Sequence, residues 1–340
     1  MKRILPLFLA LALLLTGCTA VSTTETTSQT VSQVDSPSSA LESAAESASS
    51  QLESAGEVSI TDSNGSQITL DTSAPRVVAA YGSFAEAWLL AGGELCGVTQ
   101  DALEQRDLGL PEDIAVVGTV KEPNAEEIIA LEPDLVLLAS DITAQAEIRD
   151  VLENAGLACA FFQVDTFADY AFMMEQLCAI TGREDLYEEN VTQVGQQIEE
   201  AQANAALSST RPNVLLIRAF STGIKAKTDD ELAGAILKDL GAHNIADDHP
   251  SMLEDLSLEE VIAADPDYIF VTTMGDEQKA LDYLNGLIQQ NPAWSELSAV
   301  KEDRYIVLPK DLFHYKPNNR WGESYQYLGE ILYPQMFHEE

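Results

Sequence analysis

The sequence predicts an α/β protein made of two similar lobes joined by a helical segment. Predicted strands and helices alternate along most of the chain, which is typical of parallel sheets covered by helices. The alternation stops between residues 166 and 206, where the pattern is helical apart from an interruption at Thr181-Gly182. A segment that begins at Asn124, NAEEIIALEPDLVLL, returns 133 positions later as SLEEVIAADPDYIFV from Ser257. We therefore expect an N-terminal lobe at 57–165, an interlobe helix at 166–206 and a C-terminal lobe at 207–340.

The chain begins with an export signal. Lys2 and Arg3 precede an apolar run, residues 4–15, that is too short to span a bilayer comfortably. The run ends in Leu15-Thr16-Gly17-Cys18, the pattern of a bacterial lipobox, in which the cysteine thiol receives a diacylglyceryl group before cleavage. This predicts a signal peptide at 1–18 and a lipid anchor on Cys18, which would hold the exported protein at the outer face of the cytoplasmic membrane.

Residues 19–56 have the composition of a disordered tether. Of these 38 residues 17 are Ser or Thr, and none is aromatic, Lys or Arg, so the segment has too little apolar surface to offset the entropy of ordering. Its length favours the surface of a Gram-positive cell, where a tether holds a domain away from the membrane.

The charge balance excludes some partners. Without the signal peptide the chain has 16 basic and 56 acidic residues, a net charge of −40. Nucleic-acid binding needs a basic surface, and an acidic protein is repelled by anionic lipid heads, so neither partner is expected. The cysteines that remain after lipidation, Cys96, Cys159 and Cys178, lie in apolar contexts without metal-ligand spacing and are predicted to be free thiols in the core.

The N-terminal lobe is predicted element by element. Asn64-Gly65 between two alternating runs is a strong hairpin signal. The following segments have the apolar periodicity and glycine or proline stops of successive strands and helices: a strand at 76–82, a helix at 83–93, a strand at 95–99, a helix at 125–131, a strand at 134–139, a helix at 144–156 and a strand at 157–164.

The C-terminal lobe repeats this order. After the helical segment, the pattern predicts a strand at 213–220, a helix at 230–241, the second copy of the repeated helix and strand at 257–271, a helix at 276–290, a strand at 303–309 and a closing helix at 318–333. Both lobes are thus Rossmann-like.

The repeated segment contains one glutamate per copy without an evident structural role. Asn124 and Ser257 are good N-cap residues, and Glu127 and Glu260, three positions later, would complete a capping box in each copy. The preceding glutamates, Glu126 and Glu259, fall in the first helical turn with the side chain in water. The residues alone leave open that all four are ordinary acids at helix N-termini.

Further pieces with a recognisable pattern are RVVAAYGSFAEAWLLAG, LGAHNIAD and PAWSELSAVKEDRYIVLP. Through these pieces and both copies of the repeat, residues 57–334 resemble the class III substrate-binding proteins of ABC importers, which carry cobalamin, haem and iron–siderophores. The resemblance implies a ligand cleft between the lobes and a surface glutamate on each lobe that docks into an arginine pocket of one permease subunit. On this sequence those glutamates are Glu126 and Glu259. The implied partners are a permease dimer and its cytoplasmic ATPase, with the binding protein a monomer.

The candidate ligand-binding residues follow strands, because open α/β sheets bind ligands at the carboxyl ends of their strands. Six of the 16 basic residues fall in two such loops, near 218–227 and 310–320, which favours an anionic ligand. Phe313 could stack on a flat ligand, and His314 or Tyr315 could bind haem iron. The predicted ligand-binding residues are Tyr81, Ser83, Lys121, Arg218, Lys225, Lys310, Phe313, His314, Tyr315 and Arg320.

A ferric siderophore is the predicted cargo, with haem, a corrinoid or another chelate as alternatives and no resident cofactor. An enzyme is not expected, because G-x-S-x-G, P-loop and H-E-x-x-H motifs are absent from the sequence. Ser83 and Glu86, three apart at a helix start, are interpreted as another capping box. A binding protein for zinc or manganese requires several metal ligands that converge on one site, but the four histidines are scattered along the sequence. A surface enzyme and an adhesive lipoprotein remain as alternatives from other classes.

Overall fold

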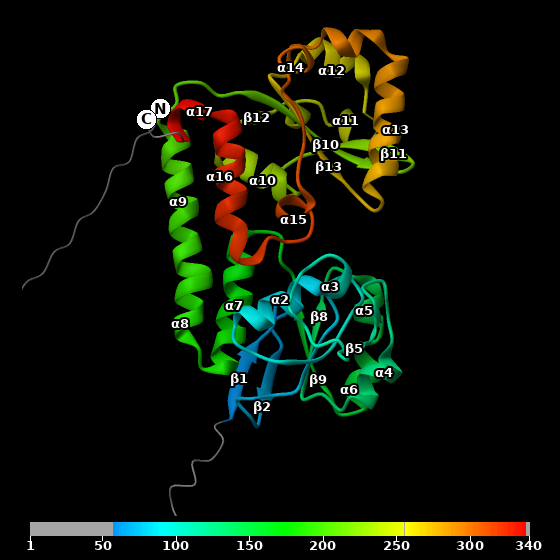
Figure 1. Cartoon of the computed structure of the whole chain (residues 1–340), viewed down its shortest axis with the longest axis vertical. Helices are drawn as coiled ribbons and strands as arrows, with labels where there is room; N and C mark the ends of the chain where they lie inside the picture. The colour runs from blue at the N-terminus through cyan, green and yellow to red at the C-terminus, as the bar shows by residue number, and fades with distance from the viewer. Residues whose placement is uncertain (1–56, 255, 338–340) are drawn as a thin grey trace, which may run out of the picture. The chain divides into compact units, whose positions relative to one another are not determined.

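The computed structural model describes residues 57–254 and 256–337, which contain two α/β sheets with their helices (Figure 1). The predicted signal peptide, Cys18 and the tether lie outside the described residues. The α/β fold with two lobes is confirmed, since each sheet is built from one half of the chain.

The sheet of the N-terminal lobe is entirely parallel, in the order β5-β4-β3-β8-β9. Its central strands are apolar on both faces because helices cover both. The strands are β3 Val77–Ala79, β4 Leu95–Val98, β5 Ala115–Val116, β8 Leu135–Ala139 and β9 Ala158–Phe162, and the helices are α2 Gly82–Leu90, α3 Asp101–Glu104, α4 Ala125–Ala130, α5 Thr143–Glu147 and α6 Arg149–Asn154.

Two small hairpins accompany this sheet. The predicted Asn64-Gly65 turn joins β1 Val58–Thr61 to β2 Gln67–Leu70, with Gly65 in the left-handed region at φ 79°. The Asp62 carboxylate fixes the turn by accepting from the backbone N–H groups of Asn64 and Ser66 at 3.0 and 2.8 Å. The second hairpin pairs β6 Gly118–Thr119 with β7 Glu122–Pro123.

The sheet of the C-terminal lobe has the order β11-β10-β13-β14, and β12 also pairs with β10. The strands are β10 Asn213–Phe220, β11 Gly223–Lys227, β12 His243–Asn244, β13 Tyr268–Thr273 and β14 Tyr305–Val307. The segment 220–227 was expected to be a cleft loop, and this was wrong: a tight turn at Ser221-Thr222 folds Gly223–Lys227 back as an antiparallel edge strand, with Lys225 opposite Arg218. The other pairings in this sheet are parallel.

The helices of this lobe follow the predicted order, with extra short turns. They are α10 Leu232–Asp239, η2 Ile245–Asp247, α11 Ser251–Glu254, α12 Leu258–Ala264, α13 Glu277–Gln290, η3 Pro292–Glu296, α14 Ser298–Lys301, α15 Lys310–Phe313, η4 Asn318–Arg320, α16 Trp321–Leu332 and α17 Pro334–Phe337.

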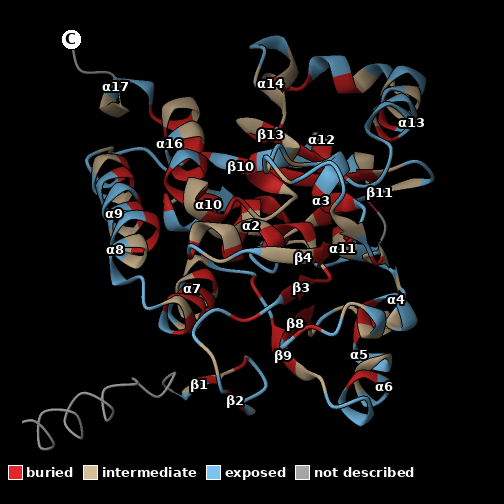
Figure 2. Ribbon diagram, turned by 60° about the horizontal axis from the view of Figure 1, so that its bottom comes forward, coloured by how far each residue is buried: buried red, intermediate tan, exposed pale blue. Residues whose placement is uncertain are grey.

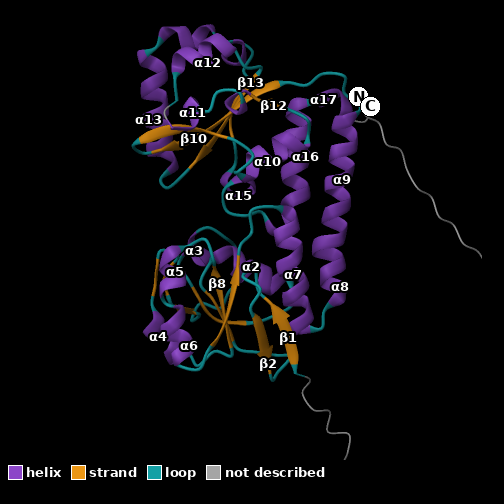
Figure 3. Ribbon diagram, turned by 180° about the vertical axis from the view of Figure 1, so that it is seen from behind, coloured by secondary structure: helices purple, strands orange, loops and turns teal. Residues whose placement is uncertain are grey.

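The interlobe segment is helical in two stretches. Helix α7, Phe167–Thr181, begins with a capping box between Thr166 and Asp169 and ends at Gly182, which is left-handed at φ 67°. A second stretch then runs through α8 Glu184–Tyr187, the π-helical turn η1 Glu188–Thr192 and α9 Gln193–Ala206 (Figure 3). Helix α16 packs along α9, so the end of the chain reinforces the connection.

The largest hydrophobic core extends through both lobes (Figure 2). Strand side chains alternate between cores: Val77 and Ala79 of β3 face the shared one, whereas Val78 faces a core of the N-terminal lobe alone. In β10, Leu216 faces the shared core and Leu215 a core of the C-terminal lobe. A continuous core opposes free hinge motion, because opening would expose apolar surface at about 25 cal/mol per Å².

Candidate functional site

A cleft of about 630 Å³ lies at the carboxyl ends of the strands and is bounded by both lobes. This volume is within the usual range for small-molecule sites. The N-terminal lobe contributes residues that follow β3, β4, β6 and β8, and the C-terminal lobe contributes residues that follow β13 and α15. The lining residues are Tyr81, Asp101, Gln105, Val120, Lys121, Asp141, Ile142, Thr143, Ala144, Met274, Gly275, His314 and Tyr315.

Tyr81 stands where β3 ends and α2 begins. Its extended backbone makes it the N-cap of α2, and its ring packs edge-on against Phe84 with centroids 5.3 Å apart. The next residue must be glycine, because a Cβ at Gly82 would lie 2.9 Å from the backbone nitrogen of Ala102. Burial, and then the charges of Asp101 and Asp141, raise the pKa of Tyr81 to about 12, so its phenol is a hydrogen-bond donor at neutral pH.

Asp101 and Asp141 make this side of the cleft acidic. Asp101 is only 8% exposed, and one carboxylate oxygen accepts from the backbone N–H of Gly82 at 2.7 Å. The other oxygen has no hydrogen-bond partner among the described residues. Asp141 is exposed in the loop after β8. Of the predicted ligand-binding residues, Lys121 also lines this side.

His314 and Tyr315 form the opposite wall, as predicted. Both backbone N–H groups donate to the carbonyl of Lys310, at 2.8 and 2.9 Å, and the two rings lie 5.3 Å apart. Burial, followed by the charges of Arg218, Lys310 and Lys316, lowers the pKa of His314 to about 4. The imidazole is therefore neutral at physiological pH and keeps a lone pair for a metal or a hydrogen-bond donor.

Most of the basic residues in the two cation-rich loops have partners within the protein. Arg218 pairs with Glu231, which also accepts from Lys227 at 2.9 Å. Lys316 pairs with Asp165. Lys310 donates from Nζ to the carbonyl of Gly275 at 2.6 Å, at the edge of the cleft, and Lys225 is exposed on the edge strand β11.

Of the ten predicted ligand-binding residues, six do not line the cleft: Arg218, Lys225 and Lys310, whose positions are given above, and Ser83, Phe313 and Arg320. Ser83 is 1% exposed, inside the first turn of α2. Phe313 is also 1% exposed and packs against Tyr327, so its ring is not available to stack on a ligand. Arg320 pairs with Asp311 and Glu323 at 2.8 and 2.7 Å and borders a neighbouring hollow of about 310 Å³. The sequence gives residue order but not which side of a short helix meets the core.

Arg106 is a prominent residue that the sequence analysis missed. It lies after α3 and donates from the N-terminal lobe to the backbone carbonyls of Tyr315 and Lys316. The loop after β4 was not included among the strand-end loops, although the same rule applies to it. Including that loop would have brought Asp101, Gln105 and Arg106 into the prediction.

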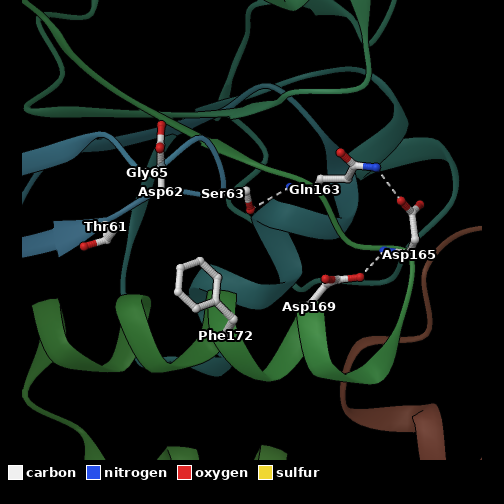
Figure 4. Close-up of a pocket in the computed structure, with 8 residues that line it drawn as sticks. All are labelled: Thr61, Asp62, Ser63, Gly65, Gln163, Asp165, Asp169 and Phe172. Carbon is white, nitrogen blue, oxygen red and sulfur yellow. Dashed lines mark hydrogen bonds between the residues drawn. The ribbon is translucent and has the colours of Figure 1, made fainter. Parts of the chain in front are cut away.

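A second hollow of about 600 Å³ borders the β1–β2 hairpin (Figure 4). Its polar groups bind one another: the Gln163 amide donates to Asp165 at 2.6 Å, and the backbone N–H of Asp165 donates to Asp169 at 3.1 Å. The Ser63 hydroxyl accepts from the backbone of Gln163 at 3.1 Å. These groups are satisfied within the protein, which distinguishes the hollow from the interlobe cleft.

The two copies of the repeated segment form α4 with β8 and α12 with β13. Asn124 and Ser257 cap the helices as predicted, the Ser257 hydroxyl accepting from the N–H of Glu260 at 3.2 Å. The reciprocal half of the predicted capping box is formed in neither copy: the Asn124 backbone N–H donates to the carbonyl of Val117 at 2.8 Å, and the Glu260 carboxylate accepts from Ser251 at 3.1 Å. Glu126 and Glu259 are both exposed in the first turn.

The described cysteines are free. Cys159 and Cys178 are buried as predicted, and burial raises the pKa of their thiols to about 12 and 11, which keeps them unreactive. Cys96 is only half-buried and donates to the carbonyl of Val77 at 3.3 Å. Within residues 57–254 and 256–337 no cluster of three metal-ligating side chains is found, and no helix there has the length and apolarity to cross a bilayer.

Two α/β sheets bound one cleft and are joined by a long helical connection, an arrangement that can hold a small molecule between the lobes. Residues 77–312 match the family model described as periplasmic binding protein, and the chain belongs to this family. Its members bind solutes outside the cytoplasm and deliver them to the permease and ATPase of an ABC importer; they are not enzymes.

Relatives and solved structures of the family agree with this fold. The chain is 26% identical over 269 residues to the Fe(3+)-citrate-binding protein YfmC of Bacillus subtilis, covering 76% of this chain and 80% of that protein. The crystal structure of Staphylococcus aureus IsdE complexed with heme superposes with a TM-score of 0.63 and 19% identity, over 76% of this chain and 99% of that one. Staphylococcus aureus SirA complexed with staphyloferrin B gives 0.62 and 19%, over 83% and 99%.

Proposed function

We propose that this protein captures a ferric chelate, an iron siderophore or an iron carboxylate complex, and delivers it to its permease. The observation that carries this proposal is the position of cations at the cleft wall: Lys310 donates to the carbonyl of Gly275 at the cleft edge, and the charges of Arg218, Lys310 and Lys316 add to burial in lowering the pKa of His314. A field that disfavours a proton on an imidazole favours an anionic ligand at the same place. The printed name of the relative YfmC, an iron citrate-binding protein, supports the same ligand class.

Haem is the second candidate, because His314 is neutral and lines the cleft beside Tyr315. Neutral imidazole and phenolate are both axial ligands of haem iron. The fold neighbour IsdE was solved with heme, although at 19% identity it supports the fold rather than the ligand.

Calorimetric titration of the purified protein with ferric citrate, ferric siderophores and hemin tests these candidates. The three tryptophans are at most 2% exposed, so their fluorescence would report weakly on the cleft. We expect one ferric chelate to saturate the protein, and Lys310→Gln and Lys121→Gln to weaken binding severalfold. Lys301→Gln, at an outer pair with Glu296, is the matched control. A Soret shift with hemin that His314→Ala abolishes would instead establish haem, and saturation by none of these ligands would exclude both candidates.

We also propose that Glu126 and Glu259 are the permease-docking residues. Both side chains are exposed at the first turn of corresponding helices, and the permease dimer of an ABC importer offers two related sockets. Because each lobe has one such helix, each of the two permease subunits would receive one carboxylate. The neighbouring Glu260 is occupied by Ser251, which leaves Glu259 as the free carboxylate of that pair.

We further propose that Cys18 carries the lipid anchor and that residues 19–56 tether a monomeric binding domain to the cell surface. The lipobox sequence and the Ser/Thr-rich composition support this. Expressed in the producing cell, the wild type should incorporate radiolabelled palmitate and Cys18→Ala should not. Equal labelling of the two proteins would contradict the anchor.

A further inference from the structure

The chain segment that carries the cleft wall of the C-terminal lobe is held by the N-terminal lobe. Arg106 donates to the carbonyl of Lys316 at 3.0 Å and to the carbonyl of Tyr315. The other end of its guanidinium pairs with Glu86 on α2. The Arg106 side chain is only 10% exposed, so these contacts are largely shielded from water.

The same segment makes further contacts with the N-terminal half of the chain. The Asn318 amide donates to the carbonyl of Ser83 at 2.9 Å and to the Glu86 carboxylate. Lys316 pairs with Asp165 at 3.1 Å. Glu86 thus accepts from one residue of each lobe and joins Arg106 to Asn318.

The backbone of the segment shows that outside contacts determine its shape. Lys316 has φ 61° and Asn318 has φ 52°, both in the left-handed region, with Pro317 between them. A residue other than glycine keeps the left-handed conformation when contacts with the surrounding structure hold it there. The hydrogen bonds from Arg106 act on the backbone of one of these two residues, and the Asn318 amide anchors the other.

His314 and Tyr315 begin this segment, and both line the cleft. Tyr315 also borders the hollow of about 310 Å³ that contains Arg106 and Glu86. Tyr315 therefore lies between the ligand cleft and Arg106, and its carbonyl is one of the two that accept from Arg106.

We propose that Arg106 is a positioning residue for the ligand cleft: by holding the carbonyls of Tyr315 and Lys316 it fixes His314 and Tyr315 in the orientation that binds the ligand. This inference rests on the proposed function, in which that cleft binds a ferric chelate or haem. Arg106 does not line the cleft and acts through the segment that it holds.

Two variants and one control test the proposal. Arg106→Met removes the ion pair with Glu86 and the hydrogen bonds to the two carbonyls. Arg106→Lys keeps a positive charge for Glu86, but a lysine lacks the planar guanidinium that donates to both carbonyls. Arg149→Met is the control, because Arg149 pairs with Glu153 and packs over Phe161 within the N-terminal lobe. Affinity for ferric citrate and hemin is measured by calorimetry, and hydrogen–deuterium exchange is followed in peptides covering 314–320.

We expect Arg106→Met to lower the ligand affinity by about tenfold, because losing one charge-assisted hydrogen bond that holds the segment costs about that much. Arg106→Lys should lower the affinity by nearly as much, and Arg149→Met should leave it unchanged. Exchange at 314–320 should rise in Arg106→Met while β3 and β10 stay protected. A merely structural role would raise exchange in α2 and α3 and leave 314–320 and the affinity unchanged, which would overturn the proposal. Faster exchange at 314–320 without loss of affinity would overturn it as well.

The exchange measurement also separates this inference from the proposed function. If the wild-type protein bound neither ferric citrate, a ferric siderophore nor hemin, the proposed function would fail. Exchange at 314–320 that remained slow in Arg106→Met would show that Arg106 does not position the segment, with or without a ligand.

Discussion

The repeated segments of the two lobes agree in their backbone and differ in their surroundings. Asp134 at the start of β8 accepts from the N–H of Arg76 at 2.7 Å, and Asp267 at the start of β13 accepts from the N–H of Asn213 at 2.8 Å. Glu132 and Asp265, each two residues before that aspartate, have φ 47° and 41°. The acidic-Pro-Asp motif therefore performs one task twice: it ends the helix and aligns the next strand with its neighbour.

The cleft edges of the two lobes differ instead in charge. The N-terminal lobe presents Tyr81, Asp101 and Asp141, and acidic neighbours contribute to the raised pKa of Tyr81. The C-terminal lobe presents His314, whose pKa is lowered in part by cations. The two lobes thus share the helix and strand that present an exposed glutamate, Glu126 or Glu259, whereas their cleft edges carry different side chains.

The largest expected effect concerns Glu126 and Glu259, the exposed glutamates at corresponding positions of the two repeated segments. Under the proposed docking, Glu126→Ala with Glu259→Ala should abolish ligand uptake by cells at unchanged ligand affinity, because truncating one partner of a buried charge pair costs about 2–5 kcal/mol. Each single variant should retain partial uptake. Uptake is measured with radiolabelled iron chelate, and Glu127→Ala is the control. Normal uptake by the double variant would show that docking lies elsewhere.

The difference between the cleft edges predicts a pH dependence that belongs to the C-terminal lobe. The folded pKa of His314 is about 4, below the unfolded value of about 6.5. Between these values the unfolded chain binds a proton that the folded protein does not, so stability falls as the pH drops from 6.5 to 4, by about 2–3 kcal/mol.

Urea unfolding of the wild type and His314→Gln at several pH values measures this contribution. We expect the two proteins to differ in the steepness of the decline between pH 6.5 and 4, with the variant the less steep. Equal declines would mean that other groups account for the acid sensitivity.

The shared strand-aligning bond predicts matched losses in the two lobes. Asp134→Ala and Asp267→Ala should each lower the free energy of unfolding by about 1–2 kcal/mol, since each removes a carboxylate that accepts from a backbone N–H. Chemical denaturation measures both. Asp150→Ala, an exposed acid on α6, is the control. A loss confined to one lobe would show that the two aspartates are not equivalent.

The smallest effect is expected at the helix caps. Asn124 accepts from the N–H groups of Glu126 and Glu127 at 3.1 and 3.3 Å, whereas Ser257 accepts from that of Glu260 alone. Replacement of either cap by alanine should cost about 1 kcal/mol in thermal or urea unfolding. Ser251→Ala leaves the Ser257 cap intact and should cost less. A larger loss from Ser251→Ala than from Ser257→Ala would reverse the assigned order of importance.

Local pattern predicted most elements well, and long-range pairing accounts for the errors. The strand predicted at 213–220 has those bounds in the structure, and the interruption at Thr181-Gly182 is the left-handed end of α7. The edge strand β11 was missed although Ile224 and Ala226 alternate with Lys225 and Lys227, because its lysines were interpreted as ligand contacts in a loop; its pairing with β10 stabilises it. The capping box at Ser257 was predicted from spacing alone, but Ser251 competes for the Glu260 carboxylate.

The sequence by itself determined the features that depend on neighbours along the chain: the α/β class, the duplicated helix and strand, the exposed Glu126 and Glu259, and His314 and Tyr315 near the end of a strand. Tertiary structure decided which cations have partners, because Arg218 on β10 meets Glu231, the N-cap residue of α10, only in the folded chain. It also decided that Phe313 faces the core. The role of Arg106 depends on a contact across 209 positions, which only the folded chain brings within hydrogen-bonding distance.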